Sequence, residues 1–268
     1  MKMASLLLMA SAVWSTAVCA QHLSFREIPT REGVKQKLVY QKAAEAFASA
    51  VLFQGGPGVI GAVGSEERGW VRNDGFFLAG GAGRFAQTGV SAAAVDSPSD
   101  KRNLDNGFRS STEHAQDIAA VMAFLRKEAP GKPVCLVGTS NGSLSATSAA
   151  ALLGEKGPDC IVLTSSVSVK PQSSIVARFA HVFTDADLTQ IKVPVLIVHH
   201  KNDPCKHTPF EPMPAFVNAF PHSPKVDFIA ITGGQGHSDA CNRGHHQFLG
   251  IEREVTAQIS EWMKSLTH

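Results

Sequence analysis

Short apolar runs alternate with amphipathic stretches along most of the chain, and this alternation predicts strands separated by helices. The runs expected to form strands end at glycine, proline or small polar residues, and they cover Ser49–Phe53, Ser91–Val95, Pro133–Val137, Cys160–Thr164, Val193–His199 and Val226–Ile231. Helices are expected over Ser111–Glu128, Asn141–Leu153, Pro209–Phe220 and Ile251–Leu266, with a weaker, glycine-interrupted one over Phe76–Ala86. Strands that are apolar on both faces need crossover helices, so the fold class is α/β, a mostly parallel central sheet with helices on both faces.

The first segment after the amino end has a different pattern. Ser24–Ile28 and Lys37–Tyr40 alternate apolar and polar residues around Arg31-Glu32-Gly33, which predicts an N-terminal antiparallel hairpin. No linker and no internal repeat divides the rest, so we expect one domain over residues 21–268. The short segment Ser168–Thr189 is the only candidate for a cap, so the cap should be minimal.

The amino end has the pattern of a secretory signal peptide over residues 1–20. Lys2 precedes an apolar stretch, and small residues end it before an expected cleavage after Ala20. A membrane anchor is less well supported, because polar residues interrupt a stretch shorter than the roughly 20 residues of a spanning helix. Acylation of Cys19 is a minor alternative, because Val18 stands where lipoprotein signals have Gly, Ala or Ser. We therefore expect an exported protein, periplasmic or secreted, with no membrane span.

Composition narrows the functional classes. Of 268 residues 44% are hydrophobic and 18% charged, which is typical of a globular chain with a sizeable core. Lys and Arg number 25 against 23 Asp and Glu, so no basic surplus favours binding to a nucleic acid.

The sharpest motif is the G-x-S-x-G sequence Gly138–Gly142. It follows an expected strand and opens an expected helix, which is the context in which a strained turn holds a serine hydroxyl above the edge of a sheet. Ser140 is therefore the candidate nucleophile. The alternative is an ordinary glycine and serine turn between two elements.

A nucleophilic serine needs backbone donors for the oxyanion that forms on the substrate. In this architecture one donor is the N–H that follows the nucleophile, here Asn141, and the other comes from the loop after an earlier strand. That loop is Gln54–Gly58; Pro57 has no N–H, so Gly56 is the expected donor and Gly58 the fallback. The loop lacks the following Gly-Lys-Ser/Thr of a phosphate-binding loop, and a plain tight turn remains the alternative.

With these features the chain resembles the α/β-hydrolases over essentially all of residues 21–268. The resemblance implies the order nucleophile, acid, base, with the acid in the loop after the strand Val193–His199. Asp203 lies there. The alternative role for Asp203 is a solvated turn residue before Pro204.

Two histidines compete for the role of the base. His237 follows the last strand closely, as in many α/β-hydrolases, whereas His246 directly precedes the final helix. The segment from His246 to Glu252 resembles the H-G-F-x-G-x-E sequence of a group of uncharacterised exported bacterial α/β-hydrolases, with Gln247 in place of the usual Gly. That group also has a D-x-C near the acid and a cysteine before the histidine. The resemblance favours His246 over His237, with His245 as a third candidate.

Four cysteines remain after removal of the signal, which allows three pairings in an exported chain. Cys205 follows the acid and Cys241 precedes the favoured base, so a Cys205–Cys241 bridge would tie two catalytic loops together. Cys135 and Cys160 lie on consecutive expected strands and form the second candidate pair. The alternative for each pair is that its two cysteines remain free thiols.

The expected function is therefore hydrolysis of a small-molecule carboxylic ester through a Ser-His-Asp triad and an acyl-enzyme. An amidase or peptidase with the same triad and a non-catalytic binding protein of the same fold are the alternatives. We expect no cofactor and no metal, because the eleven histidines contain no H-E-x-x-H and the chain has no C-x-x-C. His114 and Asp117 are expected to form a surface pair on a helix.

Overall fold

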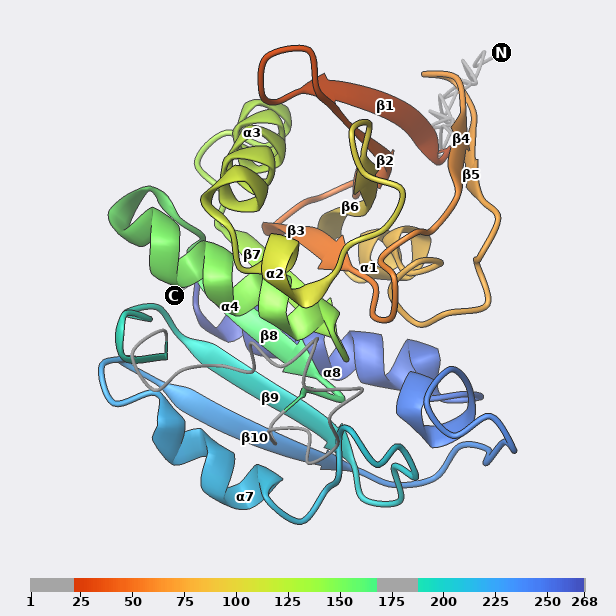
Figure 1. The fold of residues 1–268 in the computed structure, drawn as a ribbon, viewed down its shortest axis with the longest axis vertical. Coiled ribbons are helices and arrows are strands. Elements are labelled where there is room, and N and C mark those ends of the chain that lie inside the picture. The colour runs from red at the N-terminus through yellow and green to blue at the C-terminus, as the bar shows by residue number, and fades with distance from the viewer. Residues whose placement is uncertain (1–21, 168–187, 268) are drawn as a thin grey trace, which may run out of the picture.

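Eight strands form one sheet in the computed structural model, which describes residues 22–167 and 188–267 (Figure 1). Their order is β1-β2-β6-β3-β7-β8-β9-β10. The strands β1 and β2 pair antiparallel, as do β2 and β6, and every other pair is parallel. The strands of this sheet are β1 (Ser24–Pro29), β2 (Lys35–Gln41), β3 (Ala48–Phe53), β6 (Val90–Pro98), β7 (Val134–Thr139), β8 (Cys160–Thr164), β9 (Val195–His200) and β10 (Val226–Ile231).

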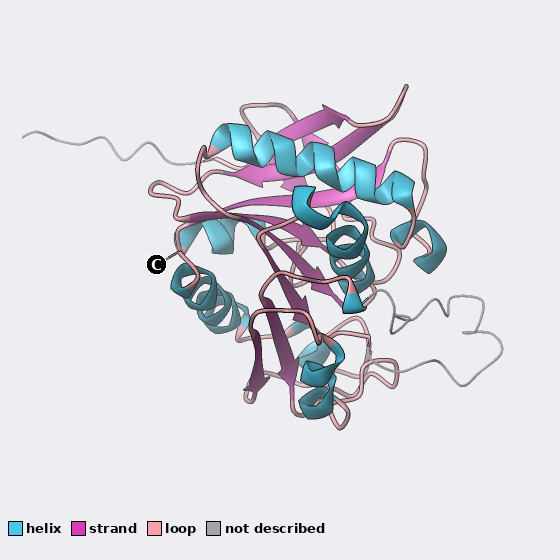
Figure 2. Ribbon diagram, turned by 90° about the vertical axis from the view of Figure 1, so that its left-hand side faces the viewer, coloured by secondary structure: helices cyan, strands magenta, loops and turns pink. Residues whose placement is uncertain are grey.

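Helices cover both faces of the sheet, as the view in Figure 2 shows. Side chains of α3, α4 and α7 pack on one face with Val51 and Phe53 of β3, whereas α1 and α8 pack on the other face with Ala50 and Leu52. The alternation along β3 explains why a strand buried on both sides is apolar throughout. The helices are α1 (Ala82–Gln87), α2 (Asn106–Arg109), α3 (Thr112–Glu128), α4 (Gly142–Leu153), α7 (Met213–Phe216) and α8 (Glu252–Ser265), with 3-10 turns η1 (Gly154–Lys156), η2 (Val217–Ala219) and η3 (Gly244–Gln247).

The predicted mostly parallel sheet and the N-terminal hairpin are confirmed. The Ser111 hydroxyl accepts a hydrogen bond from the His114 N–H at 3.1 Å and caps α3. No helix in the described part of the chain is long and apolar enough to cross a membrane.

Three predictions of local structure were wrong or incomplete. The helix expected over Phe76–Ala86 begins only at Ala82, because the backbone N–H groups of residues 77–79 donate to glutamine side chains instead of to a helix. The helix expected over Pro209–Phe220 begins at Met213, with the proline-containing residues before it in turns. A short antiparallel pair, β4 (Ala62–Gly64) and β5 (Gly69–Val71), was not predicted.

Two predicted segments lie outside the described residues. The signal peptide over residues 1–20 is one of them. The candidate cap, residues 168–189, is the other, apart from its last two residues.

Candidate active site

The turn between β7 and α4 holds Ser140 in a left-handed backbone conformation, with φ of +52°. A non-glycine residue rarely adopts this conformation, and strain of this kind concentrates at functional sites. Glycine is needed on both sides: a Cβ on Gly138 would lie 2.2 Å from the Gly142 carbonyl oxygen, and one on Gly142 would lie 2.1 Å from the Phe53 carbonyl oxygen. The motif therefore forms a tight strand-to-helix turn that packs directly on β3.

The loop after β3 lies against this serine. A Cβ on Gly55 would lie 2.6 Å from the Ser140 Cβ, so only glycine allows the approach. The Gly58 N–H donates to the Gly55 carbonyl at 3.1 Å, which removes the fallback donor. Among the described residues, the backbone N–H groups of Gly56 and Asn141 have no acceptor, so both are available to a ligand.

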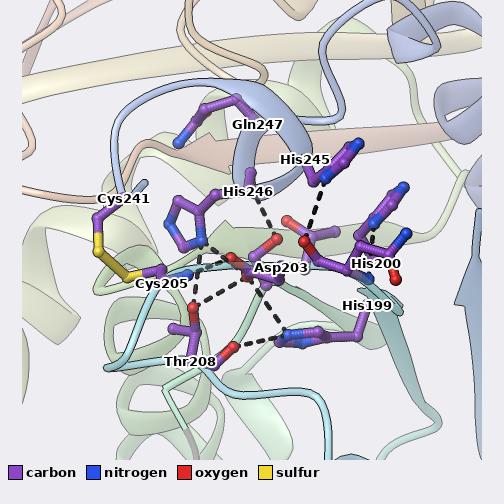
Figure 3. Close-up of polar contacts among 12 residues, drawn as sticks. His199, His200, Asp203, Cys205, Thr208, Cys241, His245, His246 and Gln247 are labelled. Atoms are coloured by element: carbon purple, nitrogen blue, oxygen red, sulfur yellow. Dashed lines mark hydrogen bonds and ion pairs between the residues drawn. A yellow bond between two sulfur atoms is a disulfide. The ribbon is translucent and has the colours of Figure 1, made fainter. Parts of the chain in front are cut away.

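Asp203 follows β9 and makes its bonds with both carboxylate oxygens (Figure 3). Oδ1 accepts from the Cys205 N–H at 2.9 Å, and Oδ2 accepts from the Thr208 hydroxyl at 3.0 Å and from His246 Nδ1 at 2.8 Å. Burial alone would raise the pKa of this carboxyl, but the hydrogen bonds from His199 and His246 outweigh it and hold the pKa well below its usual range. Asp203 is thus a buried carboxylate that stays ionised.

His246 lies in η3 and is fully buried. Because Asp203 is acceptor-only, Nδ1 carries the proton and Nε2 is the basic nitrogen of the neutral ring. In the described part of the chain Nε2 has no hydrogen-bond partner, and no hydrogen bond joins it to Ser140 Oγ. Catalytic hydrogen bonds are often long before substrate binds, so this geometry leaves the base role open to His246.

The other two histidine candidates lie elsewhere. His237 is exposed, and its Nδ1 accepts from the Asp239 N–H at 3.0 Å. His245 stacks on His200 with ring centroids 4.2 Å apart, and its Nδ1 lies 3.1 Å from the Asn202 carbonyl. The structure gives neither ring a hydrogen bond to Asp203; of the three histidines, only His246 makes one.

His199 and Thr208 also contact the Asp203 carboxylate, and the sequence did not point to this contact. His199 Nε2 lies 2.9 Å from the Thr208 carbonyl and 3.4 Å from Asp203 Oδ2. Both neighbours are acceptors, so Nε2 of His199 carries its proton. A buried histidine at the end of an apolar strand has no sequence signal that separates it from a core residue.

Two glutamines connect the segment that contains His246 to the loop after β3. The Gln247 Oε1 accepts from the Phe77 N–H at 3.0 Å, and the Gln54 Oε1 accepts from the N–H groups of Leu78 and Ala79 at 3.2 Å each. A longer contact of 3.5 Å joins the two side chains. Gln247, the departure from the expected glycine, thus positions the wall of the site.

Both expected disulfides are present. Cys205–Cys241 joins the segment after Asp203 to the segment before η3, and Cys135–Cys160 joins register partners on β7 and β8. No cluster of three or more His, Cys, Asp or Glu that could hold a metal ion occurs among the described residues.

The prediction of a surface pair at His114 and Asp117 was wrong. His114 and Asp117 are 1% and 0% exposed. Asp117 pairs with the Arg31 guanidinium at 2.9 Å, and His114 Nε2 lies 3.0 Å from the Ser145 hydroxyl. Helical spacing placed them on one face but could not show that this face packs on α4 and the hairpin.

A cleft of about 430 Å³ opens beside Ser140. Its polar lining includes Asn73, Asp239, Asn242 and Arg243, and the glycines of the Gln54–Gly58 loop form one side. A small molecule that enters it meets Ser140 and the loop that carries Gly56.

Comparison with known proteins identifies the fold of the chain. No protein-family model and no curated protein matches the chain. Among solved structures, the Pyrococcus furiosus esterase Pf2001 matches with a TM-score of 0.63 and 16% identity over 97% of this chain and 98% of that one. Est1E from Butyrivibrio proteoclasticus matches with 0.61 and 16% over 90% and 98%, and the dienelactone hydrolase from Anabaena variabilis with 0.60 and 14% over 91% and 98%. The chain has the α/β-hydrolase fold of these proteins.

Proposed function

We propose that the protein is an exported serine hydrolase that cleaves carboxylic esters with Ser140, His246 and Asp203. The observation that carries the proposal is the buried Asp203–His246 pair, with 2.8 Å between Oδ2 and Nδ1 and Nε2 left without a partner in the described residues. A neutral histidine oriented by a carboxylate is the general base that a serine nucleophile requires. The names of the matching esterases and the dienelactone hydrolase agree with this chemistry.

The reaction then has two halves. His246 Nε2 takes the proton of Ser140 as Oγ attacks the ester carbon, and the N–H groups of Gly56 and Asn141 stabilise the oxyanion. The imidazolium, stabilised by Asp203, returns the proton to the departing alcohol and leaves an acyl-enzyme on Ser140. Water, deprotonated by His246, attacks the acyl carbon; the imidazolium then gives the proton to Ser140 Oγ as the carboxylic acid is released.

Substitution of the nucleophile tests the proposal. Ser140→Ala should lower kcat for p-nitrophenyl acetate by about 10⁶-fold, because no other group supplies the covalent step. Ser148→Ala, on the same helix α4, is the matched control and should keep kcat within a few-fold. Full turnover by Ser140→Ala would show that the nucleophile has been misassigned.

Ester preference separates the proposal from its alternatives. Matched ester and amide substrates should show a larger kcat/KM for the ester, and the polar cleft of about 430 Å³ favours short acyl chains over long ones. A larger kcat/KM for the amide would indicate an amidase or peptidase. Folded protein that no fluorophosphonate labels would indicate a binding protein.

Export rests on the amino-terminal pattern and on the two disulfides, which form in oxidising compartments. Expression of the full chain in a bacterium with a periplasm should give a mature protein that begins at Gln21. A product that keeps residues 1–20 in the cytoplasm would contradict export without affecting the assignment of the triad.

A further inference from the structure

A single arginine lies buried behind the loop that carries Gly56. Arg109, at the end of α2, is 1% exposed. Its Nη1 donates to the Ser145 hydroxyl at 2.8 Å, and its Nη2 donates to the carbonyl oxygens of Gln54 and Gly56 at 3.2 Å each. No carboxylate among the described residues lies within ion-pair distance of it, and its Nε has no partner there.

Burial of the Arg109 guanidinium without an ion-pair partner among the described residues costs free energy of folding. An ion moved from water to a protein interior without a counter-ion costs several kcal/mol. His114, which shares Ser145 with Arg109, gives no compensation: burial, then the charges of Arg109 and Arg31, lower its pKa to about 3, so its ring is neutral. Burial likewise lowers the pKa of Arg109, to about 9 against the opposing charge of Asp105, which still leaves the guanidinium charged at neutral pH.

The contacts of Arg109 determine the shape of the loop. Its two carbonyl acceptors lie on either side of the Gly55–Gly56 peptide, which carries the N–H proposed to bind the oxyanion. The loop closes so tightly over the guanidinium that a Cβ on Gly58 would lie 2.7 Å from Nη2. A hydrogen-bond donor stabilises the charge of a transition state most when it is already in position and does not have to move during the reaction.

We propose that Arg109 is a positioning residue for the hydrolytic reaction: it fixes the Gly56 N–H by its two carbonyl bonds and places a positive charge behind the developing oxyanion. This inference rests on the proposed function. It assigns to Arg109 an effect on the transition state that exceeds its effect on substrate binding, because the negative charge appears only as Oγ attacks.

The test compares Arg109→Met, which removes the charge at similar length, with Arg109→Lys, which keeps it. Arg109→Met leaves the Ser145 hydroxyl and the carbonyl oxygens of Gln54 and Gly56 without this donor, so the melting temperature is measured for every variant. Arg109→Gln takes the place of the Met variant if the Met variant does not fold. Active sites are counted by fluorophosphonate titration, and kcat and KM are measured with p-nitrophenyl acetate. The affinity of an aryl trifluoromethyl ketone, whose adduct with a serine carries an oxyanion, is measured in parallel.

The neutral variant should lower kcat per active site by about 10²-fold and leave KM within about twofold, with a similar loss of ketone affinity. Arg109→Lys should recover at least about tenfold of kcat. The matched control is Arg31→Met, which breaks the buried pair with Asp117 and should lower the melting temperature with kcat per active site unchanged.

Two results would overturn the inference. One is a neutral variant with a lower melting temperature and unchanged kcat per active site, which would make Arg109 merely structural. The other is a Lys variant no better than the Met variant, which would exclude the charge as the cause. Failure of the proposed function is visible separately, as turnover that survives Ser140→Ala in a chain with Arg109 intact.

Discussion

The part of the candidate site that carries the proposed nucleophile and the part that carries the proposed acid and base are held in place by different means. On the nucleophile side, formed by Gln54–Gly58 and Gly138–Gly142, backbone packs against backbone at distances that exclude a Cβ. On the acid–base side, formed by Asp203–Thr208 and Gly244–Gln247, side-chain hydrogen bonds and the Cys205–Cys241 disulfide connect separate loops. The nucleophile side is therefore sensitive to added atoms, whereas the acid–base side is sensitive to lost bonds.

After loss of Ser140 itself, the largest effect on activity is expected from substitution of Asp203. Asp203→Asn replaces the acceptor of the His246 Nδ1–H with an amide and favours the wrong tautomer, so kcat should fall by about 10⁴-fold. Steady-state kinetics with p-nitrophenyl acetate measure it. Asp227→Asn is the control. Asp227 Oδ2 accepts a hydrogen bond from Trp262 Nε1 at 2.6 Å, and this substitution should change kcat only a few-fold. Equal losses in the two variants would remove Asp203 from the triad.

A methyl group added at Gly142 should destabilise the turn that carries Ser140. Gly142→Ala forces a Cβ within 2.1 Å of the Phe53 carbonyl, so the free energy of unfolding should fall by at least about 3 kcal/mol. Gly131→Ala is the control: its φ is also positive, at +73°, but no atom lies within 4 Å of the new Cβ. It should lose about 1 kcal/mol from backbone strain alone. Urea unfolding compares the two, and equal losses would contradict the close packing.

Removal of either disulfide should lower stability by a similar amount, but only one of them should affect activity. Their sequence separations are 36 for Cys205–Cys241 and 25 for Cys135–Cys160. Chain entropy therefore predicts similar losses of roughly 3 to 4 kcal/mol on removal of either. Only the double substitution Cys205→Ala/Cys241→Ala should also lower kcat per folded molecule, on the order of 10-fold or more, because it releases the acid and base loops.

Cys135→Ala/Cys160→Ala should leave that kcat unchanged, because β7 and β8 remain paired by their backbone hydrogen bonds. Thermal unfolding and kinetics on the same samples measure both properties. An equal loss of kcat in both double variants would mean that the Cys205–Cys241 bridge has no particular role at the site.

The last expected effect concerns the dependence of stability on pH. Burial lowers the pKa of His114 to about 3, so between about pH 6.5 and pH 3 the unfolded chain binds a proton that the folded chain does not. Stability therefore declines as pH falls through that window. His114→Gln should flatten this dependence of the unfolding free energy on pH, whereas the exposed His237→Gln should not. An unchanged slope in His114→Gln would contradict a buried neutral ring.

Elements whose pattern is set by their own burial were predictable from the sequence. The strands and α3 have apolar residues at the spacing that their packing requires, and β8 and β10 have the predicted bounds. Elements that depend on distant partners were not. Residues 77–79 are held by Gln54 and Gln247, and nothing local to them indicates this.

The candidate site divides in the same way. The strained turn at Ser140 has a local signature, and the position of Asp203 follows from strand order. The choice among His237, His245 and His246 depends on which ring contacts Asp203. The order of residues along the chain does not give the distance between each ring and the Asp203 carboxylate. Arg109 and His199 have no sequence signature at all, because their roles arise from what packs around them.

The central claim is that Asp203 and His246 activate Ser140, and the site of covalent labelling tests it most directly. Fluorophosphonate-treated protein is digested, and the labelled peptide and the labelling rate are determined for the unmodified chain, His246→Ala and His237→Ala. We expect a single adduct on Ser140, at an unchanged rate in His237→Ala and at a rate lower by about 10³-fold or more in His246→Ala. An adduct on another residue, or loss of labelling in His237→Ala with normal labelling in His246→Ala, would contradict it.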